Sequence, residues 1–556
     1  MSSKDNQAKG TPEGEEQEPS VVNPWASLIL LGGMAAIILS GLFTDAGKLS
    51  GEWGSLLDAI NGKGKQAPAS EGEATATGRV LRWNSSVIGA IGSLEDRFDL
   101  ESPFCQLVQP RMRGVLARLG EGSEEVLIGD DGWLFYRPSF AHLTAKTKVG
   151  LTGDERGYDA AYEAVTGFAR YLDSRGIKLV LMPVPPKLAV HPERFTSSDS
   201  SEIIVSKADQ RWAERIEAAG VRVFRTSAAL REFQSQFDSP AYLQTDTHWR
   251  PESMEWCARK LSEYLVAEGL IDPGSLLPEG ILKESTIAAK GDLWRMLRLH
   301  EDSSLFPPEE VPLKQVGSSS GMKWRPDRAS EVLLMGDSFC NIYSLGQMGW
   351  GEGAGFAEHL GHSLRKPLDV VLRNSDGAHA TRKIIAQDLA RGRDRLQGKK
   401  VVVWEFAARE LTQGRWIEME YQLGEKPESL FVEVVDDQVL EVEGTLVEIS
   451  RIPIPGSVPY QDFVATIHLS GLTAADGGDA GGTEALAYVR AMQGNKWLPT
   501  ARLRPGQRVR VTLGSWQEAE ADFGRWNRSE ASEDLLLEPV NWAREIRLVS
   551  EEDESP

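Results

Sequence analysis

Short apolar runs alternate along the middle of the chain with segments in which apolar residues recur at helical spacing. Lys178–Val184 and Val401–Trp404 are runs of this kind, which are typical of strands covered on both faces. Between residues 158 and 172, large apolar residues recur every three or four positions, which predicts a helix with one buried face. Further buried strands are expected at Val221–Phe224, Val332–Met335 and Asp369–Leu372. This alternation predicts a three-layer α/β/α domain with a mostly parallel sheet over residues 81–424.

Beyond residue 424 the pattern changes to short alternating runs that are interrupted by Gly, Pro and Asp. The run Arg508–Leu513 alternates polar and apolar side chains, as a strand with one buried face does. We therefore expect a separate all-β domain, a barrel or a sandwich, over residues 425–549. Within that class, our interpretation is a five-stranded barrel of the oligonucleotide/oligosaccharide-binding type.

The N-terminal part carries one long apolar segment. No charged residue occurs from Val21 to Thr44, and Pro24–Phe43 is long enough to cross a bilayer as a helix. A cleavable signal peptide is the alternative, but an acidic segment precedes the run and no A-x-A site follows it. We therefore expect an uncleaved transmembrane anchor. The expected parts are a disordered acidic tail (1–23), the anchor (24–44), a linker (45–80) and a second acidic tail (550–556).

Charge and cysteine content narrow the class of function. The chain has 556 residues and a formal net charge of −21 at pH 7, so its surface would repel the phosphates of nucleic acids. Cys105, Cys257 and Cys340 are an odd number without a C-x-x-C pair, which excludes a disulfide framework and a Cys-based zinc site. We expect no nucleic-acid partner, no metal and no cofactor.

Two short segments carry candidate chemistry. In Asp246-Thr-His248, an extended backbone would point both side chains the same way, so the carboxylate could fix the imidazole tautomer that leaves the other nitrogen free as a base. In Gly336-Asp-Ser338, a buried strand runs into a turn at the carboxyl end of the sheet, where open α/β sheets bind ligands. A serine hydroxyl is a poor nucleophile without an adjacent base, and His248 would supply one.

Each segment also has an ordinary structural interpretation. Asp-x-His occurs in turns with a local hydrogen bond, and Gly-Asp-Ser is a common turn or helix cap. Their joint occurrence at the edges of predicted elements favours catalysis. The other seven of the eight histidines lie in no comparable setting, and we expect them to be surface or structural residues. Cys340 is an alternative nucleophile, but we expect it to be buried in the first turn of the next helix.

The combination of Gly-Asp-Ser-Phe with Asp-Thr-His-Trp resembles the SGNH hydrolase superfamily, and within it the alginate O-acetyltransferase group of AlgJ and AlgX. In most SGNH enzymes the serine block comes first. Here Asp246 and His248 precede Ser338, which is the permuted order of that group. The resemblance spans Val126 to Leu411 and includes the segments VLIGDDGWLFY, LVLMPVPPK, GDLWRML and VVVWEFAARE.

The resemblance implies an SGNH-like domain in a membrane-anchored periplasmic enzyme that acetylates hydroxyls of an exopolysaccharide through an acetyl-serine intermediate. It implies Ser338 as nucleophile, His248 as general base and acid, and Asp246 as the orienting carboxylate. The backbone N–H of Ser338 is expected to donate to the oxyanion. Lys187, in one of the matching segments, is interpreted first as a structural residue, and contact with substrate is the alternative that its place on a loop after a strand allows.

The resemblance also implies partners and a location. An integral-membrane O-acyltransferase would supply the acetyl group, and the polysaccharide secretion machinery would be the larger assembly. The expected location is the inner membrane, crossed once, with the catalytic domain in the periplasm. The acceptor polysaccharide stays open, because the C-terminal domain shows no assignable sugar-binding motif.

Two other functions fit the same residues. An acetylesterase would use the triad with water as the acceptor and would remove acetyl groups from a glycan. A non-catalytic glycan-binding scaffold of a secretion system would be expected to lack a member of the triad, and none is missing here.

Overall fold

The computed structural model describes residues 103–549 with gaps. The gaps are 145–154, 196–202, 273–279, 319, 375–376, 426–429, 456–457, 459, 476, 479, 531, 533–534 and 536–537. The predicted tails, anchor and linker lie outside the described residues. Among the helices that are described, none is long and apolar enough to cross a bilayer.

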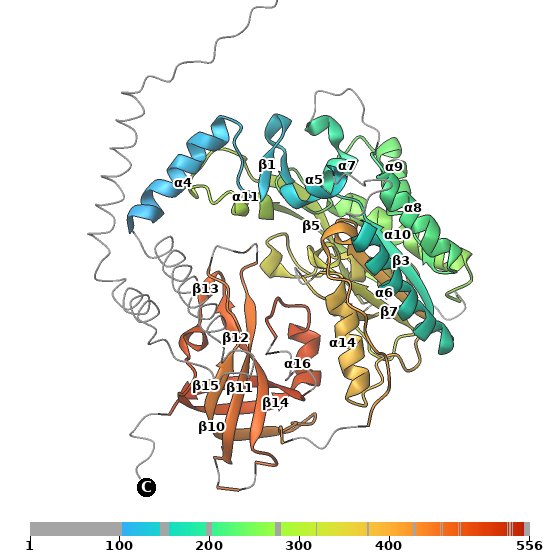
Figure 1. Cartoon of the computed structure of the whole chain (residues 1–556). Helices are drawn as coiled ribbons and strands as arrows, with labels where there is room; N and C mark the ends of the chain where they lie inside the picture. The colour runs from blue at the N-terminus through green and yellow to red at the C-terminus, as the bar shows by residue number, and fades with distance from the viewer. Residues whose placement is uncertain are drawn as a thin grey trace, which may run out of the picture. The chain divides into compact units, whose positions relative to one another are not determined.

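A five-stranded parallel sheet forms the centre of the first domain (Figure 1). Its strand order is β4-β3-β9-β7-β8, and every neighbouring pair is parallel. The central strand, β9, is the last of the five in the chain. The strands are β3 (Lys178–Val184), β4 (Arg222–Val223), β7 (Val332–Gly336), β8 (Asp369–Leu372) and β9 (Val401–Ala407). The predicted parallel sheet is confirmed.

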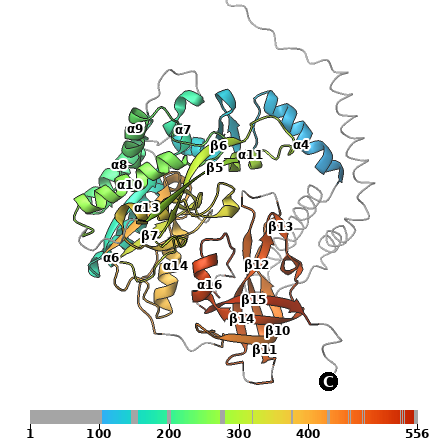
Figure 2. The ribbon, with the colours of Figure 1, turned by 180° about the vertical axis from the view of Figure 1, so that it is seen from behind.

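Helices cover both faces of this sheet, which explains why its strands are mostly apolar. Successive strand residues point to opposite faces, so Val332 and Leu334 join one core while Leu333 and Met335 join the other. Figure 1 shows α14 on the near side, and Figure 2 shows α13 on the opposite side. The first core includes α9 (Thr226–Gln236), α10 (Pro251–Ala267) and α13 (Phe356–Leu364); the second includes α6 (Glu155–Ser174), α8 (Lys207–Ala218) and α14 (His379–Ala390).

The chain before residue 425 contains further elements outside the sheet and the helices that cover it. Two antiparallel hairpins pair β1 with β2 and β5 with β6. The bounds are α4 (Pro103–Arg118), β1 (Val126–Ile128), β2 (Leu134–Tyr136), α5 (Arg137–Thr144), α7 (Lys187–Val190), β5 (Ile281–Ala289), α11 (Asp292–Met296), β6 (Glu309–Gly317), α12 (Ser338–Asn341) and α15 (Glu410–Gln413).

The C-terminal all-β domain is a closed barrel. The strands follow the order β11-β10-β14-β15-β12, and β11 also pairs with β12, which closes the ring. The pair β12–β15 is parallel and the other four pairs of the ring are antiparallel. The five-stranded barrel expected from the sequence is therefore what the chain forms. Its elements are β10 (Val439–Ile449), β11 (Phe463–Ala474), β12 (Glu484–Gln493), the appended β13 (Lys496–Trp497), β14 (Arg508–Ser515), α16 (Trp516–Phe523) and β15 (Val540–Leu548).

Candidate active site

Ser338 begins α12, directly after the turn that ends β7. Asp337 precedes it as the helix cap and accepts the Phe339 N–H at 2.9 Å through Oδ1. Its other oxygen, Oδ2, accepts the Ala407 N–H of β9 at 3.0 Å. Because one carboxylate joins α12 to the neighbouring strand, the turn that carries the serine is fixed to the centre of the sheet.

Gly336 lies at this turn, where two neighbouring side chains leave no space for a Cβ atom. A Cβ atom there would lie 2.7 Å from Cys340 Sγ and 2.8 Å from Glu405 Oε2. Glu405 Oε2 accepts the Asp337 N–H at 2.9 Å and the Cys340 S–H at 3.3 Å. Burial and the nearby Asp337 carboxylate raise the pKa of Glu405, beneath the turn, well above its usual value.

Cys340 is fully buried, as the sequence predicted. Burial raises the pKa of its thiol well above the usual value, and the Glu405 and Asp337 carboxyl groups raise it further. A thiol in this environment is a poor source of thiolate. The geometry therefore favours Ser338 over Cys340 as the nucleophile.

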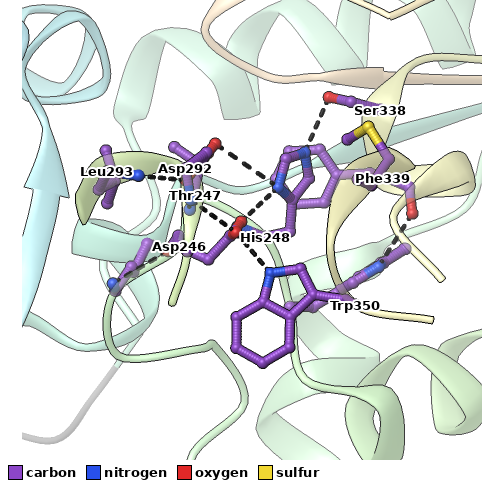
Figure 3. A network of polar contacts seen from close by, with 12 residues as sticks. Asp246, Thr247, His248, Asp292, Leu293, Ser338, Phe339 and Trp350 are labelled. Carbon is purple, nitrogen blue, oxygen red and sulfur yellow. Dashed lines mark hydrogen bonds and ion pairs between the residues drawn. The ribbon is translucent and has the colours of Figure 1, made fainter. Parts of the chain in front are cut away.

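The structure brings Ser338, His248 and Asp246 together in one chain of hydrogen bonds (Figure 3). His248 Nε2 lies 2.8 Å from Ser338 Oγ, and His248 Nδ1 lies 2.6 Å from Asp246 Oδ1. Because a carboxylate accepts hydrogen bonds, Nδ1 carries the proton and Nε2 can accept the serine proton. Asp246 and His248 are buried, whereas Ser338 is half-buried.

The segment that carries the histidine is tied directly to α12. Trp249 donates its indole N–H to the Phe339 carbonyl at 3.1 Å, and the Tyr343 hydroxyl donates to the Trp249 carbonyl at 2.6 Å. Both bonds join Trp249, the residue after His248, to residues that follow Ser338 in the chain. They hold the segment of the base beside the segment of the nucleophile.

Two residues that the sequence did not single out complete the surroundings of Asp246. Its Oδ2 accepts the Trp350 indole N–H at 2.8 Å and the Asp292 backbone N–H at 2.9 Å. Trp350 lies between Gly349 and Gly351, whose φ angles of 89° and 93° are left-handed and favour glycine. With Oδ2 occupied, Oδ1 is left to face the imidazole.

The charges of this cluster are strongly coupled. Burial disfavours a charged Asp246, but the neighbouring His248 outweighs burial and holds the pKa of Asp246 well below its usual range. Burial also disfavours the imidazolium, yet Asp246 raises the pKa of His248. Burial and the Asp246 carboxylate raise the pKa of Asp292. Asp246 therefore stays ionised to lower pH than Asp292, whose pKa is raised to about 6.

Asp246, His248 and Asp292 approach each other closely enough to be considered as metal ligands. The hydrogen bonds argue against that arrangement. Each Asp246 oxygen accepts protein N–H groups, and both Asp292 oxygens accept donors from Thr247. A cation would have to replace these donors as well as the proton on His248 Nδ1, so a hydrogen-bonded triad fits the cluster better.

Lys187 is buried, and its ammonium group faces the backbone. Its Nζ donates to the carbonyls of Leu134, Gln244 and Asp246 at 2.6, 2.7 and 3.1 Å. Burial lowers its pKa to about 7, although Asp246 opposes the shift. All three donors of an ammonium group are used in this way. Substrate contact by Lys187 stays a prediction, and the geometry favours a role in holding the loop of Asp246.

The first turn of α12 presents backbone N–H groups, as every helix N-terminus does. The Phe339 N–H donates to the Asp337 side chain, and the Cys340 N–H donates to the Asp337 carbonyl at 3.1 Å. Among the residues described, none accepts the Ser338 N–H. Its role as an oxyanion donor stays a prediction, which this arrangement supports.

Other histidines have structural partners of their own. His142 is buried and hydrogen-bonds to Asp209 and Thr412 at 3.1 and 2.9 Å. His468 in the barrel lies 2.6 Å from Glu484. These contacts fit the structural role expected for both.

Comparison with known proteins identifies the family. The family model described as ALGX, the SGNH hydrolase-like domain of the acetyltransferase AlgX, matches residues 126–408, just over half of the chain. The chain belongs to this family. The five-stranded parallel sheet, with the triad at its edge, is thus the SGNH-like domain of an AlgX-type chain. The resemblance drawn from the sequence is confirmed.

Curated relatives of this AlgX-type chain are named probable alginate O-acetylase AlgJ. The protein from Pseudomonas aeruginosa is 29% identical over 221 residues, which are 39% of this chain and 53% of that protein. The protein from Pseudomonas syringae pv. tomato is 26% identical over 299 residues, which are 52% of this chain and 70% of that protein. The match to the first relative therefore spans about half of its length.

Solved structures were also compared with the AlgX-type chain. The O-acetyltransferase domain of Pseudomonas putida AlgJ is 22% identical, with a TM-score of 0.40, and the match covers 52% of this chain and 92% of that domain.

Proposed function

We propose that this AlgX-type protein is an O-acetyltransferase that acetylates hydroxyls of a polysaccharide through an acetyl-Ser338 intermediate. The observation that carries the proposal is the hydrogen-bond chain from Ser338 through His248 to Asp246 at the carboxyl end of β7. Membership of an acetyltransferase family supports the reaction class. The names of the curated relatives support alginate as the acceptor.

In the first half-reaction, Ser338 Oγ attacks the carbonyl carbon of an acetyl ester while His248 Nε2 takes the serine proton. The tetrahedral intermediate carries its negative charge on the former carbonyl oxygen, to which the Ser338 N–H would donate. When the intermediate collapses, the bond to the leaving oxygen breaks and His248 returns the proton to that oxygen. The products are acetyl-Ser338 and the deacetylated donor.

In the second half-reaction, a sugar hydroxyl takes the place of the leaving group. His248 removes the proton of the hydroxyl, and the sugar oxygen attacks the acetyl carbon of acetyl-Ser338. The intermediate collapses with cleavage of the bond to Ser338 Oγ, which recovers its proton from His248. Throughout, Asp246 keeps the imidazole in the required tautomer and stabilises its charged form.

We also propose the location and the donor. The charge-free segment 24–44 would anchor the protein in the inner membrane, with the SGNH-like domain in the periplasm. An integral-membrane O-acyltransferase of the polysaccharide secretion machinery would deliver the acetyl group. Labelling of a cysteine introduced between residues 62 and 70 by a membrane-impermeant thiol reagent in intact cells tests this topology. Labelling that requires lysis would contradict it.

The reaction is tested with the full-length protein, 4-nitrophenyl acetate as donor, and oligosaccharides of alginate and of a neutral glucan as acceptors. We expect an acetylated alginate oligosaccharide and a mass increase of one acetyl group on Ser338. Ser338→Ala should lower the rate on the order of 10³-fold or more, because the members of a triad act as a unit. Ser285→Ala, on the exposed strand β5, is the matched control and should leave the rate unchanged.

The other outcomes separate the alternatives. Release of acetate that depends on Ser338, without acetylation of any sugar, would identify an acetylesterase and overturn transfer. If no acetyl-Ser338 forms and the rate of acetate release is the same in Ser338→Ala as in the parent protein, the protein would be a scaffold without catalysis.

A further inference from the structure

We propose that Asp292 is a positioning residue that locks the segment carrying both Asp246 and His248. The inference rests on the proposed role of the triad. Asp292 lies 46 residues beyond Asp246, at the start of α11, and no spacing rule connects the two. Figure 3 shows its side chain beside His248, on the side away from Ser338.

The bonds between the two segments are reciprocal. The Asp292 N–H donates to Asp246 Oδ2 at 2.9 Å. In return, Asp292 Oδ1 accepts the Thr247 N–H at 2.7 Å, and Oδ2 accepts the Thr247 hydroxyl. Thr247 stands between Asp246 and His248 in the chain, so Asp292 holds the backbone between the acid and the base.

The backbones of the two segments also touch. The Gly291 N–H donates to Thr245 Oγ1 at 3.0 Å, and the Trp294 N–H donates to the Thr245 carbonyl at 3.3 Å. A Cβ atom on Gly291 would lie 2.3 Å from the Thr245 carbonyl oxygen, so this approach requires glycine. The GDLWRML segment therefore acts as one clamp on residues 245–248.

Asp292 is not placed to transfer the serine proton. Its Oδ2 lies 3.8 Å from His248 Nδ1, whereas Asp246 Oδ1 lies 2.6 Å from the same atom. Ser338 bonds to the opposite nitrogen, Nε2. Asp292 thus acts on the reaction through Asp246 and through the charge it presents to the imidazole.

The role of Asp292 can be measured through the pKa of His248, because this pKa depends on the charged groups around the imidazole. Asp246 and then Asp292 raise the pKa of His248, followed by Asp337 from the nucleophile turn, while burial opposes all three. Lys187 from α7 faces the two aspartates, Glu309 from β6 lies near Asp246, and Tyr136 from β2 lies near Asp292. Because these other groups are unchanged in an Asp292 variant, a shift in the titration of His248 reports Asp292 itself.

The experiment measures the rate at which phenylmethanesulfonyl fluoride modifies Ser338, followed by mass spectrometry, as a function of pH. This reaction needs the base-activated serine but no acetyl donor or sugar. The full-length protein is compared with Asp292→Asn, Asp292→Ala and Thr247→Val. Asp302→Asn is the matched control, since Asp302 is exposed on the loop after α11.

For Asp292→Asn we expect the acid limb of the profile to move to lower pH by about half a unit or more, because one carboxyl beside the imidazole becomes neutral. Asp292→Ala and Thr247→Val break bonds of the clamp and should lower the plateau rate, by about tenfold or more for the alanine variant. Asp302→Asn should change neither quantity.

An acid limb that stays in place in Asp292→Asn, in a protein with the thermal stability of the parent, would overturn the inference. A lowered stability in Asp292→Ala with an unchanged plateau and limb would likewise overturn it, because the residue would then only support the fold. If the parent protein itself shows no reaction at Ser338, the proposed function fails, and this result is distinct from a failure of the clamp.

Discussion

Trp350 donates its indole N–H to Asp246 Oδ2 at 2.8 Å, although 104 residues separate the two in the chain. Both side chains are buried, so the bond is formed where water does not compete. It fills the carboxylate oxygen that the histidine does not use. Trp350 therefore helps to decide which oxygen of Asp246 meets the imidazole.

Replacing Trp350 by phenylalanine removes this donor and keeps an aromatic ring. We expect kcat/KM for an acetyl ester to fall about tenfold, because a buried charge-assisted hydrogen bond to the orienting carboxylate is lost. Trp212→Phe is the matched control, since the Trp212 indole N–H is buried and has no partner among the described residues. An equal loss of activity in both variants would show that only packing matters.

The pH dependence of the reaction should report His248. The base acts in its neutral form, and Asp246 holds the pKa of His248 above its ordinary value of 6.5 against the effect of burial. On the acid side, kcat/KM should therefore rise about tenfold per pH unit and level off with a midpoint above 6.5. A midpoint at or below 6.5, measured with 4-nitrophenyl acetate, would contradict the arrangement.

Removal of metal ions should leave the reaction unchanged. The oxygens of Asp246 and Asp292 already accept hydrogen bonds, and His248 Nδ1 faces a carboxylate at 2.6 Å. We expect dialysis against EDTA to alter neither the rate nor the melting temperature. Loss of activity that Zn²⁺ or another divalent cation restores would show that the cluster is a metal site.

Lys187→Met distinguishes support of the loop from contact with substrate. Removing the ammonium group leaves three carbonyls, those of Leu134, Gln244 and Asp246, without their donor. We expect the free energy of unfolding to fall by about 3 kcal/mol and kcat to fall with it. A rise in KM at unchanged stability would instead place Lys187 in the substrate site. The exposed Lys178→Met serves as the control.

The sequence predicted the parts of the site that depend on local spacing. Asp246 and His248 stand two residues apart, and Ser338 follows a buried strand, so both segments could be placed at the sheet edge without a structure. The parallel sheet followed from its continuous apolar runs. The barrel followed from its alternating runs, but the parallel pairing of β12 with β15 within it did not.

The remaining parts depend on contacts between distant segments. From the sequence, Trp350 would be expected to be an ordinary buried aromatic residue, and no residue near it in the chain indicates a carboxylate partner. Asp292 lies in a segment noted only for its similarity to the family, where an aspartate after a glycine is typical of a helix start. Its neighbour Gly291 was the available signal, since a close approach of two backbones often requires glycine there.

The position of β9 has a consequence for how the chain folds during synthesis. The strands β3 and β4 precede the segment of the base, β7 and β8 flank the nucleophile, and β9 joins the two halves of the sheet. A ribosome therefore releases Asp246, His248 and Ser338 before the strand that aligns them exists. Because β9 pairs with both β3 and β7, the two halves of the sheet join only after residues 401–407 have been synthesised, and pairing across such long sequence separations is slow.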